Sequence, residues 1–195
     1  ALVRVAYSPT KTSLFYVQLR QRLKPRDLAS ADLLALSPTR ALPLPGEQLR
    51  QSILLYYNTA PSASLELRTR MQASRLRDDT GLAWRSGYVL AQDVGYQINR
   101  TLKLTARYSL FDADDYDTRQ YVYEQDVLLA VSVPALYGQG TRVYGIAEIR
   151  VNRSITLWLR YAETRYRHQN VVGSGLESIQ GALRNEVKAQ LRVKF

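Results

Sequence analysis

The sequence predicts an all-β fold: an antiparallel, up-and-down transmembrane β-barrel of about ten strands, either complete or part of a larger barrel. The first observation is the strict alternation of apolar and charged residues in the segment from Leu183 to Phe195. Successive side chains of a strand point to opposite faces, so this segment has one apolar and one charged face. The second is that alternating segments of about ten residues, long enough to cross a bilayer when tilted, recur along most of the chain. The third is the terminal Phe195, which we interpret as a carboxy-terminal assembly signal of a barrel.

The predicted strands are defined by this alternation, and Pro-, Gly- or Asn-containing turns separate most of them. Residues 1–195 are predicted to form a single β-barrel domain. Segment 26–46 is predicted to be a long loop that can hold a short amphipathic helix, and segment 168–182 to be a long polar loop. The predicted strands are 2–7, 13–24, 47–58, 64–75, 81–98, 101–111, 119–133, 141–151, 154–167 and 183–195.

The predicted strand 81–98 differs from the others because small residues, including Gly87 and Gly95, lie on its polar face. Glycine within a strand marks a bend or the close approach of another element. We therefore expect this strand to curve, or another segment to pack against its inner side.

Two turns share the pair Asn-Arg, at Asn99-Arg100 and at Asn152-Arg153. Their similarity predicts that both lie at the periplasmic side of the barrel. However, the predicted strands, counted back from Phe195, place the two turns on opposite sides. Either the stretch from Arg119 to Gly140 contains an additional turn, or tight turns occur on both sides. An additional turn would make the number of strands odd, which would suit part of a larger barrel.

The composition limits the classes of protein that fit. No apolar run approaches about eighteen residues, which excludes a transmembrane helix, and the absence of cysteine excludes disulfides and thiolate metal sites. The net charge of +10 comes from 22 arginines and 5 lysines. Arginine matches phosphate geometry, so nucleic acid or another anionic ligand is one interpretation. The arginines are spread over all strands rather than clustered, which favours a barrel lumen in which they pair with acids.

A set of charged residues has the parity of the inward face of the predicted barrel. The interior of a barrel of about ten strands is nearly filled by side chains, so these charges must pair or be hydrated. Two interpretations follow: a lumen filled by Arg–Glu pairs that fix the barrel's shape, and a mildly anion-preferring pore. The predicted lumen charges are Arg68, Arg70, Lys103, Arg107, Glu124, Asp126, Glu148, Arg150, Arg160, Arg184, Glu186 and Lys188.

Other candidate sites are weaker. The loop with Asp112, Asp114, Asp115 and Asp117 has the spacing of a Ca²⁺ loop but lacks its glycine and its final glutamate, so it is only a weak metal candidate. His168 is the only histidine, and nothing marks a nucleophile or an acid as its partner, so we expect no enzymatic activity. The following aromatic residues are expected to form interfacial girdles rather than base-stacking platforms: Trp84, Tyr96, Tyr108, Tyr121, Tyr123, Tyr144, Tyr161 and Phe195.

Several stretches resemble the carboxy-terminal outer-membrane β-barrel region of Bacteroidota helix-hairpin-helix-domain (competence-related) proteins. The resemblance covers most of the chain after Tyr108, whereas residues 1–100 match only in general strand character, and no helix-hairpin-helix pattern is present. It implies an outer-membrane location and a chain that is the tail of a longer protein, and it implies no particular activity. The stretches that carry it are Tyr108–Arg119, Tyr123–Val127, Tyr137–Arg142, Leu157–Ala162, Gly173–Gly181 and Glu186–Phe195.

Together these features predict a non-enzymatic barrel of the bacterial outer membrane that acts as a pore or as a structural or assembly component. No cofactor is expected. The expected partners are outer-membrane lipid and lipopolysaccharide, the barrel-assembly machinery and other outer-membrane proteins. Two alternatives remain: an outer-membrane channel or anchor for nucleic-acid handling, which predicts salt-sensitive DNA binding, and a soluble β-barrel ligand carrier.

Overall fold

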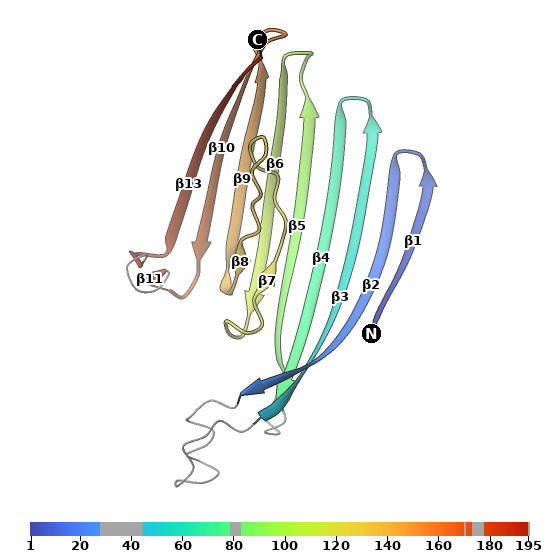
Figure 1. The fold of residues 1–195 in the computed structure, drawn as a ribbon, viewed down its shortest axis with the longest axis vertical. Coiled ribbons are helices and arrows are strands. Elements are labelled where there is room, and N and C mark those ends of the chain that lie inside the picture. The colour runs from blue at the N-terminus through green and yellow to red at the C-terminus, as the bar shows by residue number, and fades with distance from the viewer. Residues whose placement is uncertain (28–44, 79–82, 170, 173–177, 195) are drawn as a thin grey trace.

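The computed structural model describes residues 1–27, 45–78, 83–169, 171–172 and 178–194. Within these ranges the chain is all-β, and nine antiparallel strands form one up-and-down sheet. Each strand lies beside the sheet strand that precedes it in the chain (Figure 1). The sheet strands are β1 (Leu2–Thr10), β2 (Ser13–Asp27), β3 (Pro45–Ser62), β4 (Leu65–Asp78), β5 (Arg85–Gln97), β6 (Leu102–Ala113), β9 (Gly138–Arg150), β10 (Ile155–Tyr166) and β13 (Leu183–Val193).

In the described ranges, no helix has both the length and the apolar character needed to cross a membrane.

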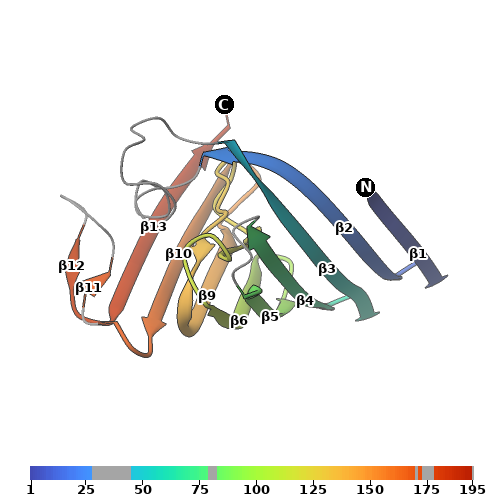
Figure 2. The ribbon, with the colours of Figure 1, turned by 90° about the horizontal axis from the view of Figure 1, so that it is seen from below.

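The sheet is curved, and the segment that joins β6 to β9 lies inside the curve (Figure 2). We call the face inside the curve the concave face, the opposite face the convex face, and residues 114–137 the inserted segment. The inserted segment contains two short strands that pair with each other, β7 (Gln120–Tyr121) and β8 (Ala135–Leu136). It leaves the sheet after Ala113 and returns at Gly138, and these two residues are cross-strand partners. The inserted segment therefore does not interrupt the pairing of β6 with β9.

The alternation of side chains gives the sheet two different faces. In β5, Val89 and Asp93 are buried on the concave face, whereas Tyr88 and Leu90 are exposed on the convex face. The convex face is apolar over all nine strands, and so broad an exposed apolar surface marks a site of contact with lipid or with another protein. Its exposed large apolar side chains include Val5, Phe15, Leu19, Ile53, Met71, Tyr88, Leu90, Val94, Leu104, Tyr108, Leu159, Tyr161, Val187 and Leu191.

The sheet is open within the described part of the chain. Its two edges are β1, which pairs with β2, and β13, which pairs with β10. Every residue of β1 is exposed. The antiparallel up-and-down order agrees with the predicted fold class, whereas the described strands do not close into a barrel.

The prediction of a strand over 119–133 is wrong. This stretch belongs to the inserted segment and turns back on itself: the amide of Ala130 donates to the carbonyl of Val127 at 3.1 Å, and Glu124 forms a bridge with Ser132. It therefore contains the additional turn that was one of the two alternatives. As a result, the turn at Asn99 and the turn at Asn152 lie at the same end of the sheet (Figure 1), and the number of sheet strands is odd.

The two predicted long loops are partly described. Segment 26–46 is shortened at both ends because β2 extends to Asp27 and β3 begins at Pro45, and the short helix expected within it falls outside the described residues. Segment 168–182 contains a small antiparallel pair, β11 (Val171–Val172) with β12 (Ile179–Gln180). The terminal Phe195 also lies outside the described residues.

Candidate functional site

The inserted segment packs onto the concave face through two apolar clusters. Val122 and Leu136 contact side chains of β5, β6 and β10 in one cluster. In the other, Val127 contacts residues of β9 and β10, among them Trp158, which is 7% exposed. These contacts fix the position and orientation of the inserted segment on the concave face, and they hold its acidic residues against the basic side chains of β9, β10 and β13.

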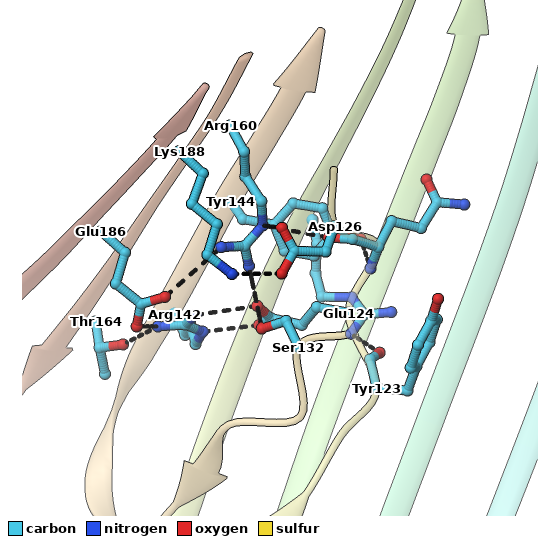
Figure 3. A network of polar contacts seen from close by, with 12 residues as sticks. Tyr123, Glu124, Asp126, Ser132, Arg142, Tyr144, Arg160, Thr164, Glu186 and Lys188 are labelled. Carbon is cyan, nitrogen blue, oxygen red and sulfur yellow. Dashed lines mark hydrogen bonds and ion pairs between the residues drawn. The ribbon is translucent and has the colours of Figure 1, made fainter. Parts of the chain in front are cut away.

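Glu124 is the central acid of the site, and its carboxylate is buried between two arginines (Figure 3). Arg142 of β9 donates from Nε to Oε1 at 2.7 Å and from Nη2 to Oε2 at 3.0 Å. Arg160 of β10 donates from Nη2 to Oε2 at 2.5 Å. The three residues are each at most 2% exposed. A paired arrangement of this kind is required there, because an unpaired charge at such a depth is strongly destabilising.

Asp126 makes the second ionic contact of the inserted segment. It accepts a hydrogen bond from Nζ of Lys188 on β13 at 2.5 Å and lies 3.8 Å from Nε of Arg160. Burial tends to raise the pKa of Asp126, but the Lys188 ammonium, the Val127 amide and the Arg160 guanidinium together hold that pKa below its usual value. Asp126 is therefore ionised at neutral pH and ties the inserted segment to β13.

Glu186 of β13 completes the group from the opposite side of the two arginines (Figure 3). Its carboxylate lies 3.5 Å from Arg142 Nη1 and 3.6 Å from Arg160 Nη1. Arg142 also donates to Thr164 Oγ1 at 2.6 Å. We call Glu124, Asp126, Arg142, Arg160, Glu186 and Lys188 together the buried charge network.

A separate ion pair fixes the neighbouring part of the inserted segment. Arg107 of β6 donates from Nε and Nη2 to both oxygens of Asp93 on β5, at 2.5 and 2.6 Å. Its Nη1 donates to the carbonyl of Tyr123 at 2.6 Å. Tyr144 lies beside this pair, with its hydroxyl 3.4 Å from Asp93, and the amide of Gln125 donates to that hydroxyl at 3.3 Å.

Glycine in β5 allows the inserted segment to approach the sheet closely. A Cβ atom on Gly87 would collide with the carbonyl oxygen of Thr118 and come within 2.9 Å of Nε2 of Gln120. Gln120 is fully buried, and it donates to Ser74 Oγ at 2.7 Å and accepts a hydrogen bond from Gln72 at 2.8 Å. The expectation that another segment packs against the inner side of this strand is confirmed.

The acidic loop at the beginning of the inserted segment is held by protein groups. Asp115 accepts hydrogen bonds from the Thr118 amide at 2.9 Å and from Arg85, which also binds Asp78 at 2.5 Å. Asp112 and Asp114 have other partners, Gln139 Nε2 and the amide of Ser86. Within the described residues, no group of three or more His, Asp or Glu side chains is placed to hold a metal ion.

The structure brings the predicted lumen charges together only in part. All except Glu124 and Asp126 lie on sheet strands with the parity of the concave face, and those two reach the same face from the inserted segment. Arg107, Arg160, Glu186 and Lys188 take part in the contacts described above. The remaining predicted charges lie outside the buried charge network and contact other neighbours. Arg68 binds Glu66 at 2.8 Å, Arg150 binds Glu148 at 2.8 Å, and Arg70 donates to Gln72 at 2.8 Å. Arg184 lies 3.8 Å from Glu186, and Lys103 lines a hollow with Glu148.

Three central residues, Asp93, Arg142 and Tyr144, were absent from the predicted set. Arg142 and Asp93 have the inward parity, and this signal would have been sufficient to include them in the predicted set. The expectation that Tyr144 belongs to an interfacial girdle is wrong, because its side chain is 2% exposed and lies on the concave face with the parity of Arg142. The same expectation is wrong for Tyr121 and Tyr123, because both belong to the inserted segment.

The site attaches the inserted segment to β9, β10 and β13 by ion pairs, and its charged groups are paired with one another. No protein-family model matches the chain, and no curated protein matches it. A function for this chain therefore has to be inferred from the geometry of the site and from the chemistry of the two faces.

Proposed function

We propose that the chain forms a β-barrel wall in a bacterial outer membrane, with the convex face toward lipid and the concave face toward a water-filled lumen. In this proposal the protein is a non-enzymatic pore that the inserted segment narrows. The observation that carries it is the contrast between the two faces: exposed apolar side chains cover the convex face, and ionised side chains gather on the concave face. A lumen side that is polar and an outer side that is apolar are typical of transmembrane barrels.

The lengths of the strands support the same proposal. A tilted strand of about ten residues crosses the apolar part of a bilayer. The shortest of the nine sheet strands, β1, has 9 residues, and β3, the longest, has 18. Strands that are longer than needed to cross the bilayer would protrude from one side of the membrane.

The barrel would need more strands than the nine described. Because their number is odd, β1 and β13 run in the same direction, and direct pairing between them would be parallel. Bacterial single-chain barrels have an even number of antiparallel strands. We therefore expect an odd number of further strands to close the sheet. The resemblance to the carboxy-terminal barrel of helix-hairpin-helix-domain proteins of Bacteroidota, on which we base the outer-membrane location, agrees with this expectation.

The function is tested on the protein extracted from membranes in mild detergent. A barrel should migrate faster on a gel before boiling than after it, and the purified barrel should make lipid vesicles permeable to small ions. A protein that remains monodisperse without detergent and shows no shift on boiling would contradict the membrane proposal and favour a soluble carrier. A shift without ion permeability would contradict the pore and favour a structural or assembly component.

A further inference from the structure

The concave face has a second region, formed by β1–β4, whose charge is not balanced. The inserted segment lies over β5, β6 and β9 and leaves most of β1–β4 uncovered (Figure 1). A hollow of about 590 Å³ opens on this region, within the size range of small-molecule sites. We call it the basic hollow. The cations of the sheet that line it are Arg4, Arg20, Arg22, Lys24, Arg50 and Arg70.

The basic hollow contains no carboxylate among its described lining residues. This distinguishes it from the buried charge network on the same face, where Glu124, Asp126 and Glu186 balance the cations. The hydrogen bonds of its arginines go to neutral acceptors: Arg4 donates to Gln18 Oε1 at 2.7 Å, and Arg50 donates to the carbonyl of Arg119 at 3.1 Å. Asp117, outside the lining, interacts electrostatically with Arg50 and Arg119. The hollow still has a large excess of positive charge, which is available to a ligand or to solvent ions.

The register of the sheet brings two of these cations directly opposite each other. Arg22 of β2 is the cross-strand partner of Arg50 on β3, with both side chains on the concave face. Opposite residues have Cβ atoms about 5 Å apart, and like charges in such positions destabilise a sheet. An anion between the two guanidinium groups would convert this repulsion into two favourable contacts. Arg70 also lines the hollow, and its guanidinium keeps unused donors, because Nη2 donates to Gln72 at 2.8 Å while Nε has no hydrogen-bond partner.

The inserted segment supplies one wall of the basic hollow. Arg119 and Tyr121 line it, and Arg119 is oriented by hydrogen bonds to the Tyr121 hydroxyl at 2.7 Å and to the carbonyl of Tyr116 at 2.5 Å. A cation on a segment that is itself fixed to the sheet has a defined position, so less conformational entropy is lost when it binds a ligand. The hollow thus has cations on four sheet strands, β1–β4, and one on the inserted segment beside them.

We propose that the basic hollow binds a small anion with several phosphate groups. Arginine forks form paired hydrogen bonds with phosphate oxygens, and arginine is the predominant cation here. Several separate cations favour a ligand with several charged groups over a single inorganic phosphate. This inference depends on the proposed function only in treating the concave face as the water-filled side.

The test is titration of the detergent-solubilised protein with inorganic tripolyphosphate, with binding followed by calorimetry and by the temperature of unfolding. The test variant is Arg22→Gln/Arg50→Gln. The control is Arg153→Gln/Arg165→Gln, which removes the same charge from two exposed residues outside the hollow. We expect tripolyphosphate to bind and stabilise the unmodified protein and the control. The test variant should bind about tenfold more weakly or worse, as expected when charge-assisted hydrogen bonds are lost.

Each contrary result has a distinct meaning. No binding by the unmodified protein, or equal weakening in the test variant and in the control, would overturn the inference. A single-stranded oligonucleotide that binds more tightly than tripolyphosphate and depends on Arg22 and Arg50 would replace the small anion with nucleic acid. Ion permeability of vesicles without tripolyphosphate binding would leave the proposed pore standing and remove only the basic hollow as a site. Tripolyphosphate binding by a protein that does not enter membranes would support the basic hollow as a site and contradict the proposed pore.

Discussion

Glu124 is the residue on which the buried charge network depends most, because its two oxygens serve two arginines and also lie within reach of the Ser132 hydroxyl. The sequence predicted that Glu124 and Arg160 face inward, because charged residues of this parity recur on several strands. Which acid pairs with which base could not be predicted. That pairing depends on the path of the inserted segment, and side-chain parity carries no information about a path in space.

Glu124→Gln is expected to destabilise the folded state by about 3–5 kcal/mol, because it leaves two buried guanidinium groups with too little negative charge. Glu163→Gln is the matched control, since Glu163 contacts Arg165 at 3.4 Å on the convex face and should change stability by about 0.5 kcal/mol or less. The measurement is denaturant-induced unfolding of both variants in the same detergent. Equal effects in the two variants would show that the buried pair has no special role.

Asp126 is expected to make the attachment of the inserted segment sensitive to acid. Its pKa in the folded protein is lowered, so its stabilising contribution is complete above about pH 4, the pKa of an unfolded aspartate, and is lost as the pH falls through the lower folded value. The unmodified protein should therefore lose more stability between pH 7 and pH 3 than Asp126→Asn does. The check is the denaturant midpoint of both proteins at the two pH values. Parallel losses would contradict the role of Asp126.

At the scale of elements, the strands were predictable and the inserted segment was not. A period of two identifies any extended segment with one buried side, and the inserted segment has this pattern because it lies flat on the sheet. Its reversal near Leu129 carries none of the usual turn residues. Leu129 itself adopts a φ of 62°, a conformation that such a side chain rarely takes. The local sequence therefore did not separate this turn from a strand, and the indication of a turn came from the two similar Asn-Arg turns at Asn99 and Asn152.

Gly87→Ala should loosen the inserted segment, because the new methyl group would meet Thr118 and Gln120. Overpacking of this kind destabilises a protein by about 1–3 kcal/mol. Gly145→Ala is the control within the same sheet, since nothing lies within 4 Å of the added atom, and it should leave stability unchanged or slightly improve it. Proteolysis of the inserted segment, compared between the two variants, provides the readout. Faster cleavage in Gly145→Ala than in Gly87→Ala would refute the packing argument.

Removal of residues 114–137 should leave the sheet intact and, in the proposed barrel, widen the pore. Ala113 and Gly138 are already cross-strand partners, so an Asn-Gly turn can join β6 directly to β9. Without the inserted segment, Arg142 and Arg160 should become hydrated on the concave face, so that they no longer need buried acids as partners. We expect the gel shift on boiling to persist and the conductance of single channels to increase. A conductance equal to that of the unmodified protein would show that the inserted segment does not limit the pore.

For the whole molecule, the central claim is that the two faces of one curved sheet meet two different environments. Alternation predicted this division for the sheet strands, because each strand keeps one parity toward the concave face except at the register shifts near the ends of β1 and β3. Closure into a barrel depends on pairing at β1 and β13, and alternation within strands says nothing about what those edges meet.

The most direct test of this claim uses the absence of cysteine, which allows a single label to be placed at will. Met71→Cys and Gln72→Cys place a fluorescent label on neighbouring residues of β4, the first on the convex face and the second facing the basic hollow. In lipid vesicles, nitroxide-labelled lipid should quench the label at position 71, and aqueous iodide should quench the label at position 72. Quenching of both labels by iodide, with no effect of the lipid quencher at position 71, would contradict the account.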